Sequence, residues 1–217
     1  MRKATLLIVA TIGFGVLYLT AGAVLGSTPS PTASGQALLT WFSEHGGRVR
    51  IWLWFLTLSL PLFAVFASIV RERLPTPHRD VFFFGAVAFA AETAVQGWLW
   101  AGATWHPGQL DASSARALLD VASYWGPVLN STTMTMLAPI AIAAFGSSVP
   151  IPRWVGAIAA AAFTEQLVET VTVFGRHGFL APGGAMNVYL GAGLAGLSFL
   201  SIGITVARDL DQEPQPT

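Results

Sequence analysis

The sequence between residues 51 and 105 reads IWLWFLTLSLPLFAVFASIV (51–70), RERLPTPHRD (71–80) and VFFFGAVAFAAETAVQGWLWAGATW (81–105). The first and third segments are apolar and carry a single charged residue, Glu92. A helix of about 20 residues crosses the roughly 30 Å hydrocarbon core of a bilayer, and both segments are that long. The segment between them holds three Arg and two Pro, and proline ends a helix. This stretch therefore predicts two membrane-spanning helices joined by a tight turn.

Similar apolar runs occur on both sides of this stretch. The predicted spans are 4–25, 51–70, 81–105, 121–145, 154–174 and 185–207. In lipid, backbone polar groups must pair within a helix or a closed barrel, and no alternation of period two indicates a barrel. We therefore predict an all-α, polytopic bundle of six transmembrane helices. It forms a single domain over residues 1–217 that ends in a short cytoplasmic tail at 208–217.

Composition limits the classes of function. Of the 217 residues, 53% are hydrophobic and 10% charged, whereas about a quarter of the residues in soluble domains are charged. The bases are dispersed, so no basic patch for nucleic acid is expected. Because the chain has no cysteine, disulfides and thiolate metal sites are excluded. No Walker A or G-x-S-x-G motif is present, and we predict no catalytic residue and no cofactor.

The distribution of Arg and Lys predicts the orientation, because cytoplasmic loops carry an excess of these residues. Seven bases lie on the side of the N-terminus: Arg2, Lys3, Arg71, Arg73, Arg79, Arg153 and Arg208. Four lie on the other side: Arg48, Arg50, Arg116 and Arg176. Both termini are therefore expected in the cytoplasm. The strong preference for Arg over Lys, with abundant Ala and Gly, suggests a bacterial source, and hence the inner membrane.

The chain shows signs of an internal duplication. The segment SGQALLTWFS (34–43) resembles SARALLDVAS (114–123), and each is followed by a span that contains a proline and then by a span that contains a glutamate. We predict two parallel repeats, 34–106 and 114–177, each beginning with a short interfacial helix on the outer side. Parallel repeats are one way in which transporter folds are built.

Three carboxylates lie inside the predicted spans, where a charge is costly and functional sites are therefore common. Glu92 and Glu165 lie at similar depths in spans of the same direction, and Gln96 and Glu169 each follow one helical turn later. These side chains predict either a proton or cation site or hydrogen bonds that only hold helices together. The ion- or substrate-binding candidates are Glu92, Gln96, Glu165, Glu169, Asn130 and Thr133.

Histidines give a second, weaker signal. His45, His106 and His177 fall on the predicted outer side, where a metal site is one interpretation. No HExxH motif or closely spaced pair of ligands supports it, and solvated loop histidines are the alternative.

Three segments carry a resemblance to other proteins: GRVRIWLWFLTLSLPLF (47–63), RERLP (71–75) and PIPRWVGAIAAAAF (150–163). They resemble a loosely defined group of six-span actinobacterial membrane proteins of unknown function. The resemblance implies a six-span fold and assigns no functional residue.

The leading hypothesis is a transporter or sensor of a small solute, coupled to protons or cations. The alternatives are a non-catalytic membrane partner or assembly subunit, and a metal-dependent membrane enzyme. The expected partners are the lipid bilayer, a small solute or ion, and another protein or a second copy of the chain.

Overall fold

The computed structural model describes residues 2–146, 151–182 and 184–212, and every regular element in them is a helix. This confirms the predicted all-α fold. The elements in order are α1 (Lys3–Leu25), α2 (Gly35–Arg71), α3 (His78–Trp105), the 3₁₀ turn η1 (Pro107–Gln109), α4 (Ala112–Ser123), α5 (Trp125–Phe145), α6 (Arg153–Glu169), the 3₁₀ turns η2 (Thr170–Phe174) and η3 (Gly178–Leu180), the π-helical η4 (Met186–Gly191) and α7 (Ala192–Gln212).

In this part of the chain, six helical segments are long and apolar enough to cross a membrane. They are Lys3–Leu25, Gly35–Arg71, His78–Trp105, Ala112–Phe145, Arg153–Phe174 and Tyr189–Gln212, and each overlaps one predicted span. Their outward surfaces are apolar: Leu19 is 75% exposed, Phe84 73% and Trp98 69%. Such a surface is unusual in a soluble monomer and typical of contact with lipid or protein.

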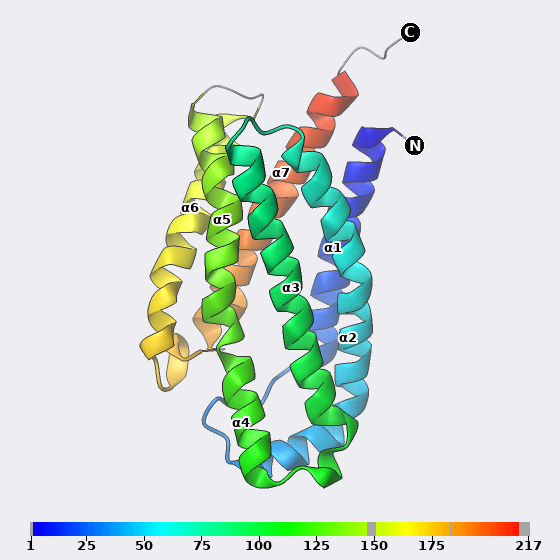
Figure 1. Ribbon diagram of the computed structural model, residues 1–217, viewed down its shortest axis with the longest axis vertical. Coiled ribbons are helices and arrows are strands. Elements are labelled where there is room, and N and C mark those ends of the chain that lie inside the picture. Colours follow the sequence, from blue (N-terminus) through cyan, green and yellow to red (C-terminus); the bar gives the residue numbers. More distant parts are fainter. Residues whose placement is uncertain (1, 147–150, 183, 213–217) are drawn as a thin grey trace.

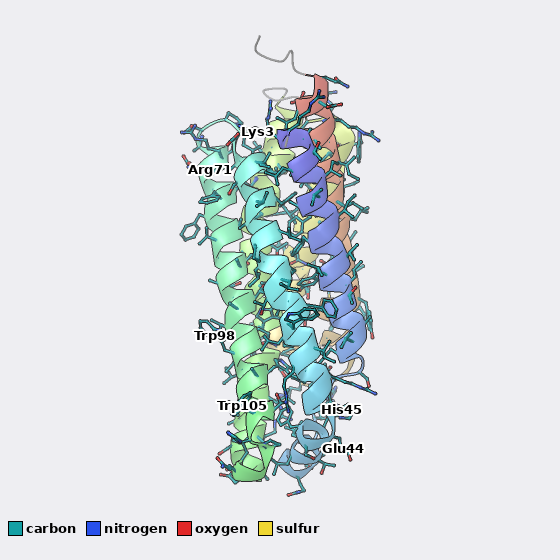
Figure 2. The ribbon with its side chains drawn as sticks, turned by 90° about the vertical axis from the view of Figure 1, so that its right-hand side faces the viewer. Lys3, Glu44, His45, Arg71, Trp98 and Trp105 are labelled. Atoms are coloured by element: carbon teal, nitrogen blue, oxygen red, sulfur yellow. The ribbon has the colours of Figure 1, made fainter. Side chains whose placement is uncertain are left out.

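The long helices run side by side, and both described ends of the chain lie at one end of the bundle (Figure 1). Helix α5 packs against α3 and α6, α2 packs against α1 and α3, and α7 packs against α1 and α6. Figure 2 shows Lys3 and Arg71 at the end that holds the termini, with His45 and Trp105 at the opposite end. We refer to these as the terminal end and the α4 end.

The centre of the bundle is an aromatic cluster around Phe63 of α2, whose side chain is 1% exposed. Its ring centroid lies 5.1 Å from that of Phe14 in α1, 4.9 Å from that of Phe89 in α3 and 5.8 Å from that of Phe199 in α7. Aromatic pairs at these distances stabilise a core beyond the contribution of their buried area. Phe63 therefore joins four of the helices.

Helix α2 differs from the expectation of a short interfacial helix followed by a separate span. It runs unbroken from Gly35 to Arg71, and 37 helical residues measure about 55 Å, more than a bilayer core. Gly46 packs against the Thr104 backbone of α3, which supports the helix where the break was expected. In the second predicted repeat, α4 and α5 are separate helices that meet at Tyr124. The duplication itself stays a prediction.

The first turns of α2 pack on α3 and α4 at the α4 end. We call this group of buried side chains the outer cluster. Its members are Leu38, Phe42, Val49, Trp100, Ala103, Ala115, Leu119 and Ala122. Together they add a helical layer to one end of the bundle.

At the terminal end, ion pairs link the first, second and last long helices. Lys3 Nζ lies 2.8 Å from Glu72 Oε2, Arg73 Nη1 lies 3.4 Å from Asp209 Oδ2, and Arg2 Nη1 lies 3.8 Å from Asp211 Oδ1. Helix α7 continues to Gln212, so residues 208–212 of the predicted tail are helical, and residues 213–217 lie outside the described part of the chain.

Candidate functional site

The three acids inside the predicted spans occupy two places, separated by helix α5. Glu165 and Glu169 lie on α6, Glu92 lies on α3, and α5 packs against both of these helices. The sequence predicts a similar depth for Glu92 and Glu165 but does not predict the helix that lies between them.

Glu165 and Glu169 are held together by one side chain. Gln166 Nε2 donates to Glu165 Oε2 at 2.8 Å and to Glu169 Oε2 at 3.0 Å. Glu169 is 1% exposed and Gln166 is 4% exposed, so these contacts are screened from solvent. The two carboxylates therefore form a close pair around a shared amide, and we call them the acid pair.

Asn187, on η4, completes the surroundings of Glu169, because its Nδ2 donates a short hydrogen bond to Glu169 Oε1. Two glycines allow this approach. A Cβ at Gly191 would collide with Glu169 Oε2, and a Cβ at Gly126 would lie 3.1 Å from Asn187 Cγ. Sequence reasoning missed Asn187, although an amide next to an apolar run was the available signal.

Two buried atoms next to this group have no hydrogen-bond partner within the described residues. They are Glu165 Oε1 and Asn130 Nδ2. Asn130 of α5 is 3% exposed and lies close enough to Glu169 for the two side chains to interact. Buried polar atoms are nearly always paired, because leaving one unpaired costs about 1–3 kcal/mol. Glu165 Oε1 therefore keeps a lone pair that a proton or a ligand could occupy.

Glu92 of α3 forms a second polar site, which contacts another face of α5. Its Oε2 accepts a hydrogen bond of 3.0 Å from Thr132 Oγ1. Thr132 and Asn130 are two positions apart, which corresponds to about 200° around a helix, so Glu92 and the acid pair lie on nearly opposite sides of α5. The structure thus brings Glu165, Glu169 and Asn130 together and leaves Glu92 apart from them.

The other two polar candidates are buried. Thr133 is 2% exposed and donates to Leu129 O of its own helix at 3.0 Å. Gln96, one turn beyond Glu92, is 8% exposed, and its Oε1 has no partner among the described residues.

The backbone around the acid pair is irregular. Helix α6 ends at Glu169 and continues as the 3₁₀ turn η2, and Asn187 lies in the π-helical η4. The last carbonyls of a helix lack intrahelical partners, and π-helical turns occur frequently at functional sites. Polar side chains and interrupted helices therefore coincide here.

The three histidines lie toward the α4 end or in the loop after α6. His45 Nδ1 donates to Trp41 O at 2.9 Å, and the two rings stack with their centroids 4.6 Å apart. The His106 ring lies 5.7 Å from that of Trp105, and His177 is exposed between η2 and η3. Within the described ranges, no group of three or more His, Cys, Asp or Glu is placed to hold a metal ion.

Two open hollows lie at the ends of the bundle. One of about 360 Å³ is lined by Ser68, Arg71, Glu72, Arg79 and Phe83, and one of about 470 Å³ by Ala101, Gly102, Trp105, His106, Gln109 and Leu110. Neither is lined by the acid pair or by Glu92.

Comparison with protein-family models, with curated proteins and with solved structures finds no match for this chain.

Proposed function

We propose that the protein is an integral protein of a bacterial inner membrane that moves a small solute coupled to protons or small cations. In this proposal the acid pair is the coupling site and both termini are cytoplasmic. Six apolar helices and their exposed apolar surface support the membrane assignment. The direct contact of two carboxylates, one of them fully buried, with one amide supports the coupling site.

Charge repulsion within the acid pair favours a bound proton or cation. Two ionised carboxylates that share one donor repel each other, and in a medium of low dielectric this repulsion is large. A proton or a cation bound between them removes it. Glu165 Oε1, which is buried without a partner among the described residues, offers a lone pair for this purpose. A pair that alternates between loaded and unloaded states is the element that ion-coupled transport requires.

Helix α6 adds to this preference for positive charge. The C-terminus of a helix carries about half a negative charge, and the acid pair occupies the last turn of α6. Donors from Gln166 and Asn187 stabilise Glu169 in the unloaded state. The acidic oxygens attract a proton or cation, and the amide donors stabilise the carboxylates when none is bound. This combination favours reversible binding of the proton or cation.

The test is proton-coupled flux in vesicles containing the purified chain and a pH-sensitive dye. Glu165→Gln and Glu169→Gln keep the shape of the side chains and remove their charge, and we expect each to reduce flux at least tenfold. Glu72→Gln is the matched control, because Glu72 is exposed and pairs with Lys3 at the terminal end. Flux in the parent no higher than in empty vesicles, or unchanged flux in both variants of the acid pair, would contradict the proposal.

A second candidate is a non-catalytic membrane partner or assembly subunit. The observation that favours it is the bonding of Glu169 to both Gln166 and Asn187, which ties α6 to η4. Hydrogen bonds between membrane helices contribute roughly 1 kcal/mol each. In this case vesicles would show no flux, a stoichiometric partner would co-purify, and replacement of Glu169 would change only stability.

A further inference from the structure

One of the two open hollows, of about 360 Å³, lies at the terminal end of the bundle, and neither acid of the acid pair lines it. Ser68, Arg71 and Glu72 line it from the end of α2, and Arg79 and Phe83 line it from the first turns of α3. Figure 2 shows Arg71 at this end. Sites for small ligands have volumes of about 300–1,000 Å³, so the space suits a small polar group. We call it the terminal hollow.

Positive charge is in excess around the terminal hollow. Arg71 Nη2 donates to Asp80 Oδ1 at 3.0 Å, and Arg79 Nε lies 3.6 Å from the same oxygen. Glu72 Oε2 accepts from Lys3 Nζ at 2.8 Å, so three bases face two acids. The Arg71 and Arg79 side chains are 42% and 50% exposed. Each guanidinium has five N–H donors, and a shared carboxylate oxygen engages few of them, so both arginines can donate to a ligand.

Phe83 gives the terminal hollow an apolar wall, one turn deeper along α3 than Arg79. The guanidinium carbon of Arg71 lies 4.7 Å from the centroid of the Phe83 ring, a cation–π contact that holds the Arg71 side chain over the ring. Val87 follows Phe83 by one turn on the same face of α3 and is 55% exposed. On α2, Ala64 is exposed one turn before Ser68. An apolar surface therefore leads from the terminal hollow toward the middle of the spans.

We propose that the terminal hollow binds the phosphate group of an anionic phospholipid of the cytoplasmic leaflet, with Arg71 and Arg79 as donors and an acyl chain along Phe83 and Val87. This binding rests on the proposed membrane assignment and orientation but does not require the acid pair. Guanidinium groups bind phosphate oxygens through paired, charge-assisted hydrogen bonds. Basic pockets between membrane helices on the cytoplasmic side bind lipid headgroups in the same way.

Two features favour a phospholipid over a free phosphate ion. The arginines lie at the ends of apolar helices, which is where the headgroups of a bilayer begin. The apolar surface of Ala64, Phe83 and Val87 complements an acyl chain and offers nothing to an inorganic anion. The excess of bases over acids favours a headgroup with a net negative charge, such as that of phosphatidylglycerol, over zwitterionic phosphatidylcholine.

Native mass spectrometry of the purified full-length chain in detergent measures this binding, with phosphatidylglycerol and phosphatidylcholine of equal chain length as probes. We expect the parent to bind its first phosphatidylglycerol at least tenfold more tightly than its first phosphatidylcholine. The double variant Arg71→Gln/Arg79→Gln should lose this preference, because both donors to the phosphate are removed. Arg48→Gln/Arg50→Gln should keep it. This matched control removes the same charge from two exposed side chains near the α4 end.

Arg79→Gln alone is a milder variant, since this side chain is half exposed, and it should weaken phosphatidylglycerol binding at least threefold. Thermal unfolding checks that all variants fold. Equal binding of the two lipids by the parent, or an equal loss of preference in both double variants, would overturn the proposal. Displacement of phosphatidylglycerol by excess glycerol phosphate would also overturn it, because the site would then be one for soluble phosphates. Binding is measured without transport, so absent flux with a retained lipid preference would contradict the coupling site alone.

Discussion

At the scale of single residues, the acid pair depends on a glycine. The site for Cβ at Gly191 is occupied by Glu169 Oε2, and Gln166 Nε2 lies 2.8 Å from it. Gly193, two positions later, has nothing within 4 Å of its Cβ site. An added methyl group would therefore clash at Gly191 and would meet open space at Gly193, although both glycines lie in or next to the last span.

We expect Gly191→Ala to destabilise the protein by about 1–3 kcal/mol, because an added methyl group in a packed site forces its neighbours to shift. Gly193→Ala should be neutral or slightly stabilising, since a helical alanine replaces glycine in open space. Thermal unfolding in detergent, followed by tryptophan fluorescence, measures both. Equal stability of the two variants would show that the close packing of η4 on Glu169 is incorrect.

Asp111 caps helix α4 outside the spans. It accepts from the Ser113 hydroxyl at 2.6 Å and the Ser114 backbone N–H at 2.8 Å. These hydrogen bonds, with further ones from the Ser114 hydroxyl and the Ser113 backbone, lower the pKa of the Asp111 carboxyl to about 2. Because the folded pKa lies below the ordinary value of 3.8, the stabilisation is complete above pH 3.8 and is lost as the pH falls through about 2.

Asp111→Ala should therefore lower the thermal midpoint of unfolding by a few degrees at pH 7, as loss of an N-cap does. The difference from the parent should persist to about pH 4 and shrink toward pH 2. Asp111→Asn keeps an oxygen acceptor without the charge, and its midpoint at pH 7 should lie between the other two. A constant difference between the parent and Asp111→Ala down to pH 2 would contradict the proposed role of the carboxylate.

At the scale of elements, the sequence predicted the long apolar helices well, because span length and charge-free composition follow directly from the properties of the bilayer. The sequence was less informative where contacts between helices determine where a helix ends or which helices are neighbours. Helix α2 is unbroken, and Gly46 contacts α3 where the break was expected, but nothing in residues 43–50 indicates that contact.

The acids show the same limit. Spacing along a helix gives depth and face, so Glu165 and Glu169 were predicted to share a face of one helix, and they do share one donor. Spacing gives no information on which helix packs between two others. The position of α5 between α3 and α6 separates Glu92 from the acid pair, and only packing of the whole bundle determines it.

At the scale of the whole molecule, the two ends of the bundle differ in chemistry. The terminal end carries the ion pairs of Lys3, Glu72 and Asp209, whereas the α4 end carries the apolar outer cluster. An exposed ion pair such as Lys3–Glu72 adds at most about 1 kcal/mol, so the charged end is better suited to orientation than to stability. A surplus of bases at that end would hold it on the cytoplasmic side during insertion.

With the terminal end in the cytoplasm, only the α4 end should be accessible from outside the cell. Thr76, in the turn between α2 and α3, and Gln109, in η1, are both exposed and lie at opposite ends of the bundle. In the cysteine-free chain, Gln109→Cys should react with a membrane-impermeant maleimide in intact bacterial cells whose outer membrane has been permeabilised. Thr76→Cys should react only after the inner membrane is opened as well. Because six spans return the chain to its starting side, the reverse labelling pattern would place both termini outside. Labelling of both sites in sealed cells would contradict a six-span topology altogether.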